Sequence, residues 1–172
     1  MKRNISRKTI KKNIKKRKSF DNVYTDISQI NDYLFIGNHK IAKDLERLDE
    51  FGITHIVNCA DELEHYVDKY DKEKMSWIWL PMYDCSYIGN VERYIPDAIE
   101  FIDKAVNNKQ KVLIHCAAGI SRSSSITIAY LMYKHNLRYE RAFSRVKAKR
   151  YCCQPNSKFV DQLKNYDFSL LR

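Results

Sequence analysis

The sequence has no Cys-x-x-Cys pair, no long hydrophobic run and no internal repeat. Its five cysteines are irregularly spaced, with Cys152 and Cys153 adjacent, and this pattern argues against a zinc site. The longest apolar stretch, Ile126 to Tyr133, is far shorter than the roughly 20 residues that cross a bilayer, and no secretory signal is present. We therefore expect a soluble protein in a reducing intracellular compartment, cytoplasmic or nuclear.

Acidic residues are missing from the first 20 positions, which contain ten Lys or Arg. Without these ten, the 31 basic residues of the chain fall to 21 and balance the 21 acidic ones, so the formal net charge of +10 belongs to the tail. Residues 1–20 are predicted to be a disordered arm. Its basic residues between 2 and 18 could bind a polyanion such as nucleic acid or acidic lipid, act as a nuclear import signal, or have no specific partner.

The 172 residues suffice for one domain with its own core. Hydrophobic periodicity predicts strands at 33–36, 53–59, 77–80 and 111–115, and helices at 41–51, 91–106, 123–136, 139–149 and 157–167. The alternation of short apolar strands with amphipathic helices predicts an α/β domain with a largely parallel sheet. Open sheets of this class bind ligands at the carboxyl ends of their strands.

One stretch, residues 115–123, reads His-Cys-Ala-Ala-Gly-Ile-Ser-Arg-Ser between a predicted strand and a predicted helix. The N–H groups of such a loop and the helix N-terminus favour an anion. Gly119 removes a Cβ that would block close approach of phosphate, and Arg122 can fold back to bind two phosphate oxygens bidentately. The predicted phosphate-binding loop consists of Cys116, Ala117, Ala118, Gly119, Ile120, Ser121 and Arg122.

Cys116 is the candidate nucleophile, because the donors that attract phosphate also stabilise a thiolate. The alternative is a small buried hydrophobe at a strand end, the common fate of an unpaired cysteine. That alternative explains the cysteine but neither Gly119 nor Arg122. We therefore expect phosphoryl chemistry at Cys116.

His115-Cys-x-x-Gly-x-x-Arg-Ser123 resembles the signature of cysteine-dependent protein tyrosine phosphatases. The residues at its variable positions are similar to those of the small dual-specificity branch. The resemblance continues through 32–38, 80–84 and 154–159 and covers residues 27 to 168, the expected catalytic domain. It implies a small twisted, mostly parallel central sheet flanked by helices on both faces. It also implies metal-independent hydrolysis of phosphoproteins through a phosphocysteine, with no cofactor.

Asp84 is the candidate general acid, since it ends an apolar segment and begins a predicted loop. From the residues alone, a turn or capping aspartate is an equal alternative. Its position 32 residues before Cys116 is similar to that of the family's acid. Asp61 and Asp97 are weaker candidates because each begins or lies in a predicted helix.

The resemblance gives supporting roles to His115, Ser123 and Asn156. It implies that the histidine orders the loop, that the Ser123 hydroxyl stabilises the leaving sulfur, and that Asn156 anchors loops around the site. Each has a structural alternative: His115 as a core histidine, and Ser123 and Asn156 as helix caps. Cys85, beside Asp84, could form an oxidative disulfide with Cys116, and Cys152 and Cys153 could be simple thiols.

The expected function is removal of phosphate from tyrosine and from serine or threonine. A phosphoinositide phosphatase is disfavoured, because lipid-acting relatives with two loop lysines would carry them where Ala118 and Ile120 stand. An RNA 5′-phosphatase stays open. A phosphate-binding module without turnover is a third interpretation, which the presence of Cys116, Arg122 and Asp84 disfavours.

Overall fold

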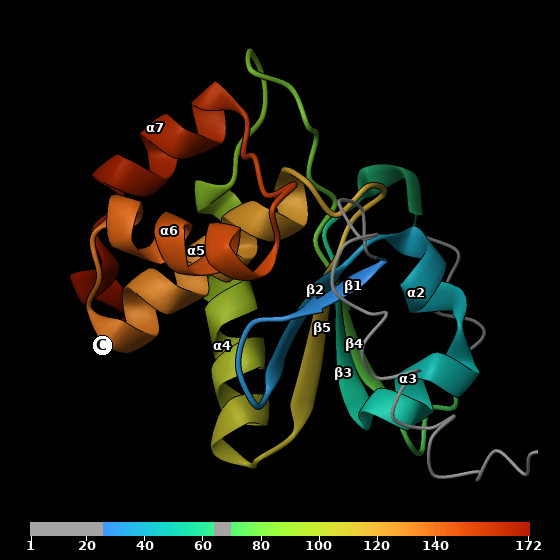
Figure 1. Ribbon diagram of the computed structural model, residues 1–172. Helices are drawn as coiled ribbons and strands as arrows, with labels where there is room; N and C mark the ends of the chain where they lie inside the picture. Colours follow the sequence, from blue (N-terminus) through green and yellow to red (C-terminus); the bar gives the residue numbers. More distant parts are fainter. Residues whose placement is uncertain (1–25, 64–69) are drawn as a thin grey trace, which may run out of the picture.

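The computed structural model describes residues 26–63 and 70–172, which form one α/β domain around a five-stranded sheet (Figure 1). The strands lie in the order β1-β2-β5-β3-β4, and all neighbours are parallel except β1 and β2. Their bounds are β1 Ile27–Gln29, β2 Leu34–Gly37, β3 Ile53–Asn58, β4 Ser76–Trp79 and β5 Lys111–His115. The central position of β5 places its carboxyl end, where Cys116 follows, in the middle of the sheet edge.

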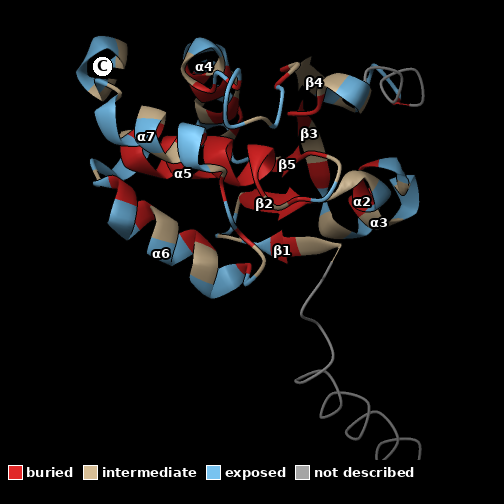
Figure 2. Cartoon of the chain, turned by 90° about the horizontal axis from the view of Figure 1, so that it is seen from above, coloured by how far each residue is buried: buried red, intermediate tan, exposed pale blue. Residues whose placement is uncertain are grey.

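Helices cover both faces of the sheet, as Figure 1 shows. The smaller layer consists of α2 His39–Lys43 and α3 Leu45–Phe51. The larger consists of α4 Ile95–Asn107, α5 Arg122–His135, α6 Tyr139–Lys149 and α7 Ser157–Asn165, with 3-10 turns η2 Glu92–Tyr94 and η3 Phe168–Leu171. In Figure 2, α5 is almost wholly buried, because α4, α6 and α7 pack around it.

The alternation of side chains along β5 builds the two cores. Val112 and Ile114 belong to the core under the larger helical layer, whereas Leu113 between them packs with Phe35 and Ile56 under α2 and α3. Strand residues point alternately to opposite faces, so a strand covered on both sides must be apolar throughout. The α/β fold expected from the sequence, with helices on both faces, is confirmed.

Two details of the predicted elements are wrong. The expected helix 41–51 is two helices, because Asp44 ends α2 and its Oδ1 accepts the Arg47 N–H at 3.1 Å as the N-cap of α3. Strand β1 was not predicted. Its three residues are too few to show a period, and its pairing with β2 is antiparallel.

Two further expectations concern the basic arm and membrane-spanning helices. The basic residues between 2 and 18, and with them the predicted polyanion-binding arm, lie outside the described residues. No helix in the described part of the chain is long and apolar enough to span a membrane.

Candidate active site

The loop between β5 and α5 surrounds the sulfur of Cys116. Cys116 is 2% exposed, and its Sγ accepts the backbone N–H of Gly119 at 3.2 Å. The Ser123 hydroxyl lies 3.3 Å from the same sulfur and is fully buried inside α5, so it is not the cap of that helix. The sulfur therefore sits inside the curve of the loop, against a backbone donor and a hydroxyl.

The carbonyl groups of the loop point away from the sulfur, and each of the four between residues 117 and 120 accepts a hydrogen bond from outside the loop. The bonds run from His39 to Ala117, from Arg150 to Ala118 and Gly119, and from Gln154 to Ile120. A peptide whose C=O faces outward turns its N–H to the opposite side. The outward bonds thus leave the N–H groups of the loop for an anion at its centre.

Gly119 is the one loop residue at positive φ, +69°. A Cβ at this position would lie 2.5 Å from the backbone oxygen of Gly37 at the end of β2. Both the left-handed backbone and the close approach of β2 therefore require glycine.

Replacing Gly119 by alanine should lower the free energy of unfolding by roughly 3 kcal/mol, from the left-handed conformation and the backbone clash together. Gly52→Ala is the matched control, because Gly52 has φ +67° but its Cβ would meet only Lys111 side-chain atoms at 3.6 and 3.8 Å. We expect this control to lose only about 1 kcal/mol. Chemical denaturation measures both variants, and equal losses would contradict the clash.

Arg122, the first residue of α5, lies 7% exposed with its guanidinium held by acidic residues. Nη2 donates to Glu62 at 2.7 Å, and Nη1 donates to Glu62, to Asp61 at 3.0 Å and to the Met82 carbonyl at 3.2 Å. Nε is buried with no hydrogen-bond partner among the described residues. The edge of the guanidinium that carries Nε is therefore the edge left for a ligand.

The charged groups around Arg122 shift one another's pKa. Burial acts to lower the pKa of Arg122, but the hydrogen bonds to Glu62 and the charge of Cys116 outweigh it and raise the pKa, so the group stays cationic. Hydrogen bonding to Arg122 lowers the pKa of Glu62 to about 2. Burial, together with the neighbouring Glu62, raises the pKa of Asp61.

Sequence reasoning missed Glu62 and considered Asp61 only as an acid. Both residues follow the end of β3, the strand that pairs with β5. Carboxyl ends of adjacent parallel strands meet at one edge, and this position was the available signal.

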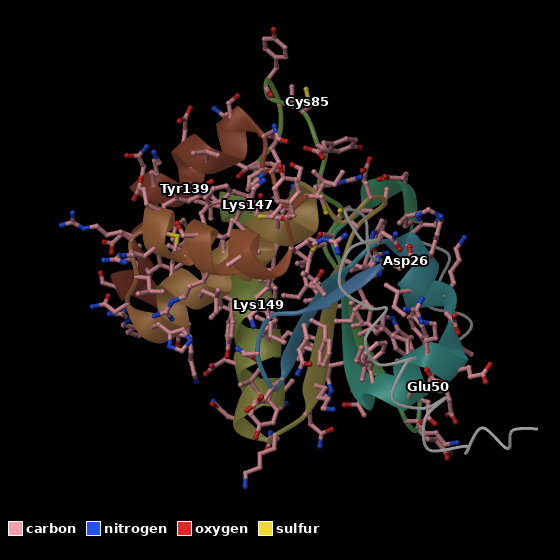
Figure 3. The ribbon with its side chains drawn as sticks, viewed as in Figure 1. Asp26, Glu50, Cys85, Tyr139, Lys147 and Lys149 are labelled. Carbon is pink, nitrogen blue, oxygen red and sulfur yellow. The ribbon has the colours of Figure 1, made fainter. Side chains whose placement is uncertain are left out.

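Asp84 lies on the same edge, in the segment between β4 and η2 that projects from this end of the molecule around Cys85 (Figure 3). Its Oδ1 accepts from the Ser121 hydroxyl and from Asn156 Nδ2, both at 2.7 Å. Its Oδ2 lies 3.9 Å from Arg122 Nε. Two donors thus orient the carboxyl group and leave one oxygen facing the free edge of Arg122.

Asn156 combines the two roles that the sequence left open. Its Oδ1 accepts the Phe159 N–H at 2.9 Å and caps α7, while its Nδ2 holds Asp84. Helix α7 and the Asp84 loop are therefore joined through one side chain.

His115, at the end of β5, is 1% exposed, and burial followed by the charges of His39 and Arg122 lowers its pKa to about 4. Its ring is therefore neutral at neutral pH.

The other thiols differ from Cys116 in their surroundings. Burial raises the pKa of Cys59, whereas backbone N–H groups of Tyr87 and Ile88 lower the pKa of Cys85.

The buried His115 should make the protein less stable in acid. Between pH 6.5, the ordinary value in the unfolded chain, and pH 4, the unfolded state binds a proton that the native ring does not. The free energy of unfolding should fall by about 3 kcal/mol as the pH drops through this window. Denaturation at pH 7, 5.5 and 4.5 should show a shallower decline for His115→Asn, and equal declines would contradict the assignment.

No group of three or more His, Cys, Asp or Glu side chains in the described ranges could hold a metal ion. The structure brings together Cys116, Arg122, Asp84, His115, Ser123 and Asn156. They come from the end of β5 and the loop after it, the first turn of α5, the segment after β4 and the N-cap of α7. The arrangement of a sulfur, inward N–H groups, a guanidinium and a carboxyl group suits transfer of an anionic group to sulfur.

The family model described as "Dual specificity phosphatase, catalytic domain" matches residues 34–168. The chain belongs to this family. Dual specificity phosphatases are also among its curated relatives: human dual specificity protein phosphatase 9 is 37% identical over 142 residues, which cover 83% of this chain and 36% of that protein. A mouse serine/threonine/tyrosine-interacting protein is 36% identical over 137 residues, covering 78% of this chain and 61% of that one.

Solved structures agree with this dual specificity phosphatase fold. The human tyrosine phosphatase-like serine/threonine/tyrosine-interacting protein superposes with a TM-score of 0.76 at 33% identity, over 85% of this chain and 98% of that one. A mouse dual specificity phosphatase crystallised with zinc tungstate superposes with a TM-score of 0.76 at 26% identity, over 90% of this chain and 94% of that one. The chain spans about a third of the length of human dual specificity protein phosphatases 9 and 6, two of the curated relatives that it matches.

Proposed function

We propose that this domain removes phosphate from tyrosine and from serine or threonine side chains of proteins through a phosphocysteine at Cys116. Family membership supports the reaction class. The observation that carries the proposal is the bond from the Gly119 N–H to Cys116 Sγ, inside a loop whose four carbonyls from residue 117 to residue 120 bond outward. The donors that surround this sulfur would also surround the oxygens of a phosphoryl group.

In the first step, the Cys116 thiolate attacks phosphorus and the bond from phosphorus to the leaving oxygen breaks. Arg122 binds the equatorial oxygens with Nε and the remaining Nη2 hydrogen, because Glu62, Asp61 and Met82 occupy the other side of the fork. Asp84 donates the proton of Oδ2 to the leaving oxygen. The alcohol or phenol departs, and a phosphocysteine remains.

In the second step, water attacks the phosphocysteine and the sulfur–phosphorus bond breaks. Asp84, now ionised, takes the proton of that water, and inorganic phosphate is released. The Ser123 hydroxyl, 3.3 Å from the sulfur, donates to the departing thiolate and stabilises it. His115, neutral beneath the loop, supports the loop without adding a competing charge.

The test is phosphate release by the full chain from peptides carrying phosphotyrosine, phosphothreonine or phosphoserine. We expect turnover on tyrosine and on at least one of the other two, with competitive inhibition by tungstate. Triphosphorylated RNA and phosphoinositides are compared at equal concentration. Preference for RNA or lipid would reject protein as the substrate, and binding of tungstate and phosphopeptide without any release would support a non-catalytic module.

A further inference from the structure

Arg150 follows the last residue of α6 and lies behind the phosphate-binding loop, 3% exposed. Charged side chains are rarely buried this fully unless their hydrogens find acceptors. Its Nε donates to the Gly119 carbonyl at 2.6 Å and its Nη2 to the Ala118 carbonyl at 3.4 Å. Its Nη1 donates to the Ser28 hydroxyl on β1 at 3.2 Å.

We propose that Arg150 is a positioning residue for phosphate binding, which holds the loop from behind so that its N–H groups face the substrate. The proposal rests on the function proposed above. Arg150 supplies the donors for two of the four loop carbonyls, and these two belong to consecutive peptides at the middle of the loop. Without them, the carbonyls would be buried without a donor or would turn inward and repel phosphate.

The other two carbonyls of the loop are held mainly by backbone donors, unlike the two that Arg150 holds. Ala117 receives the main-chain N–H and Nδ1 of His39, and Ile120 receives the main-chain N–H of Gln154. Two of these three donors are backbone groups, whose positions the fold sets. The middle of the loop, where Gly119 takes a positive φ, depends on the side chain of Arg150 instead.

The charge of Arg150 acts in the same direction as its hydrogen bonds. A Cβ built on Gly119 would lie 2.5 Å from Arg150 Nη2, so the guanidinium packs directly against the loop backbone. Its field adds to that of the α5 N-terminus and of Arg122 at the centre of the loop, where thiolate and phosphate carry negative charge. Removing Arg150 should therefore weaken anion binding and thiolate formation together.

The experiment compares Arg150→Met, Arg150→Lys and Lys149→Met with the unmodified chain. Lys149 is exposed and adjacent in sequence, so Lys149→Met removes a charge without touching the loop (Figure 3). The measurements are kcat and KM for p-nitrophenyl phosphate, the inhibition constant of tungstate, the pH profile of Cys116 alkylation by iodoacetamide, and thermal unfolding.

For Arg150→Met we expect kcat/KM to fall by roughly 10–100-fold, tungstate inhibition to weaken, and alkylation to shift to higher pH. Arg150→Lys keeps the charge but not the fork, so it should restore part of the alkylation profile while tungstate inhibition stays weaker by about threefold or more. Lys149→Met should match the unmodified chain.

Unchanged tungstate inhibition and alkylation in Arg150→Met, even with lower thermal stability, would overturn the proposal. If that variant does not fold, Arg150→Lys decides, and unchanged tungstate inhibition in it would overturn the proposal equally. Lack of turnover by the unmodified chain would reject the proposed function instead, while tungstate binding and alkylation would still test Arg150.

Discussion

Cys116→Ser should lower kcat for phosphotyrosine peptides by roughly 10⁴–10⁶-fold, the loss expected when the nucleophile of a covalent mechanism is removed. A serine hydroxyl fills nearly the same buried volume, but it is not ionised at neutral pH and lacks an adjacent base. The Gly119 N–H, Arg122 and the outward carbonyl bonds should persist. Phosphopeptide binding should therefore survive the substitution.

Single-turnover phosphate release and peptide binding, measured on the same preparation, separate these two expectations. Cys152→Ser is the matched control, because it makes the same chemical change at a partly exposed thiol in the turn that follows α6. We expect this control to keep full activity. Release by Cys116→Ser at the normal rate would reject the phosphocysteine, and loss of binding together with folding would show a structural role.

Asp84→Asn should slow turnover of phosphotyrosine or phosphothreonine peptides by roughly 10²–10⁴-fold, the usual contribution of a placed general acid. An asparagine can still accept from Ser121 and Asn156, so the loop should keep its position. It has no acidic proton for the leaving oxygen. An aryl phosphate with an acidic phenol, which leaves without protonation, should lose much less.

The comparison of good and poor leaving groups identifies the role of Asp84. Rates for p-nitrophenyl phosphate and for a phosphothreonine peptide are measured across pH for Asp84→Asn and for Asn156→Ala. The second variant removes one tether and keeps the acid, so its loss should be smaller and should not depend on the leaving group. Equal losses on both substrates in Asp84→Asn would contradict proton donation.

The elements that the sequence predicted most closely are the strand and the helix on either side of the loop. The central strand was expected at 111–115 and the helix after the loop at 123–136, and the structure has β5 at Lys111–His115 and α5 at Arg122–His135. The three-residue β1 and the break at Asp44 depend on pairing with β2 and on a side-chain cap. Neither the three residues of β1 nor the single residue at the break is enough to show a hydrophobic period.

The candidate site likewise consists of a part that local sequence indicates and a part that depends on distant contacts. The sequence by itself determined which residues, from Cys116 to Arg122, are the candidate for binding phosphate, because a turn of this kind between a strand and a helix is built from consecutive residues whose chemistry can be read directly. Only the tertiary structure decided that Glu62 and Asp61 hold Arg122, and that Arg150 and His39 hold the outward carbonyls. These contacts join residues 31 to 78 positions apart, and no local pattern encodes which distant side chain the packing of strands and helices will bring to the loop.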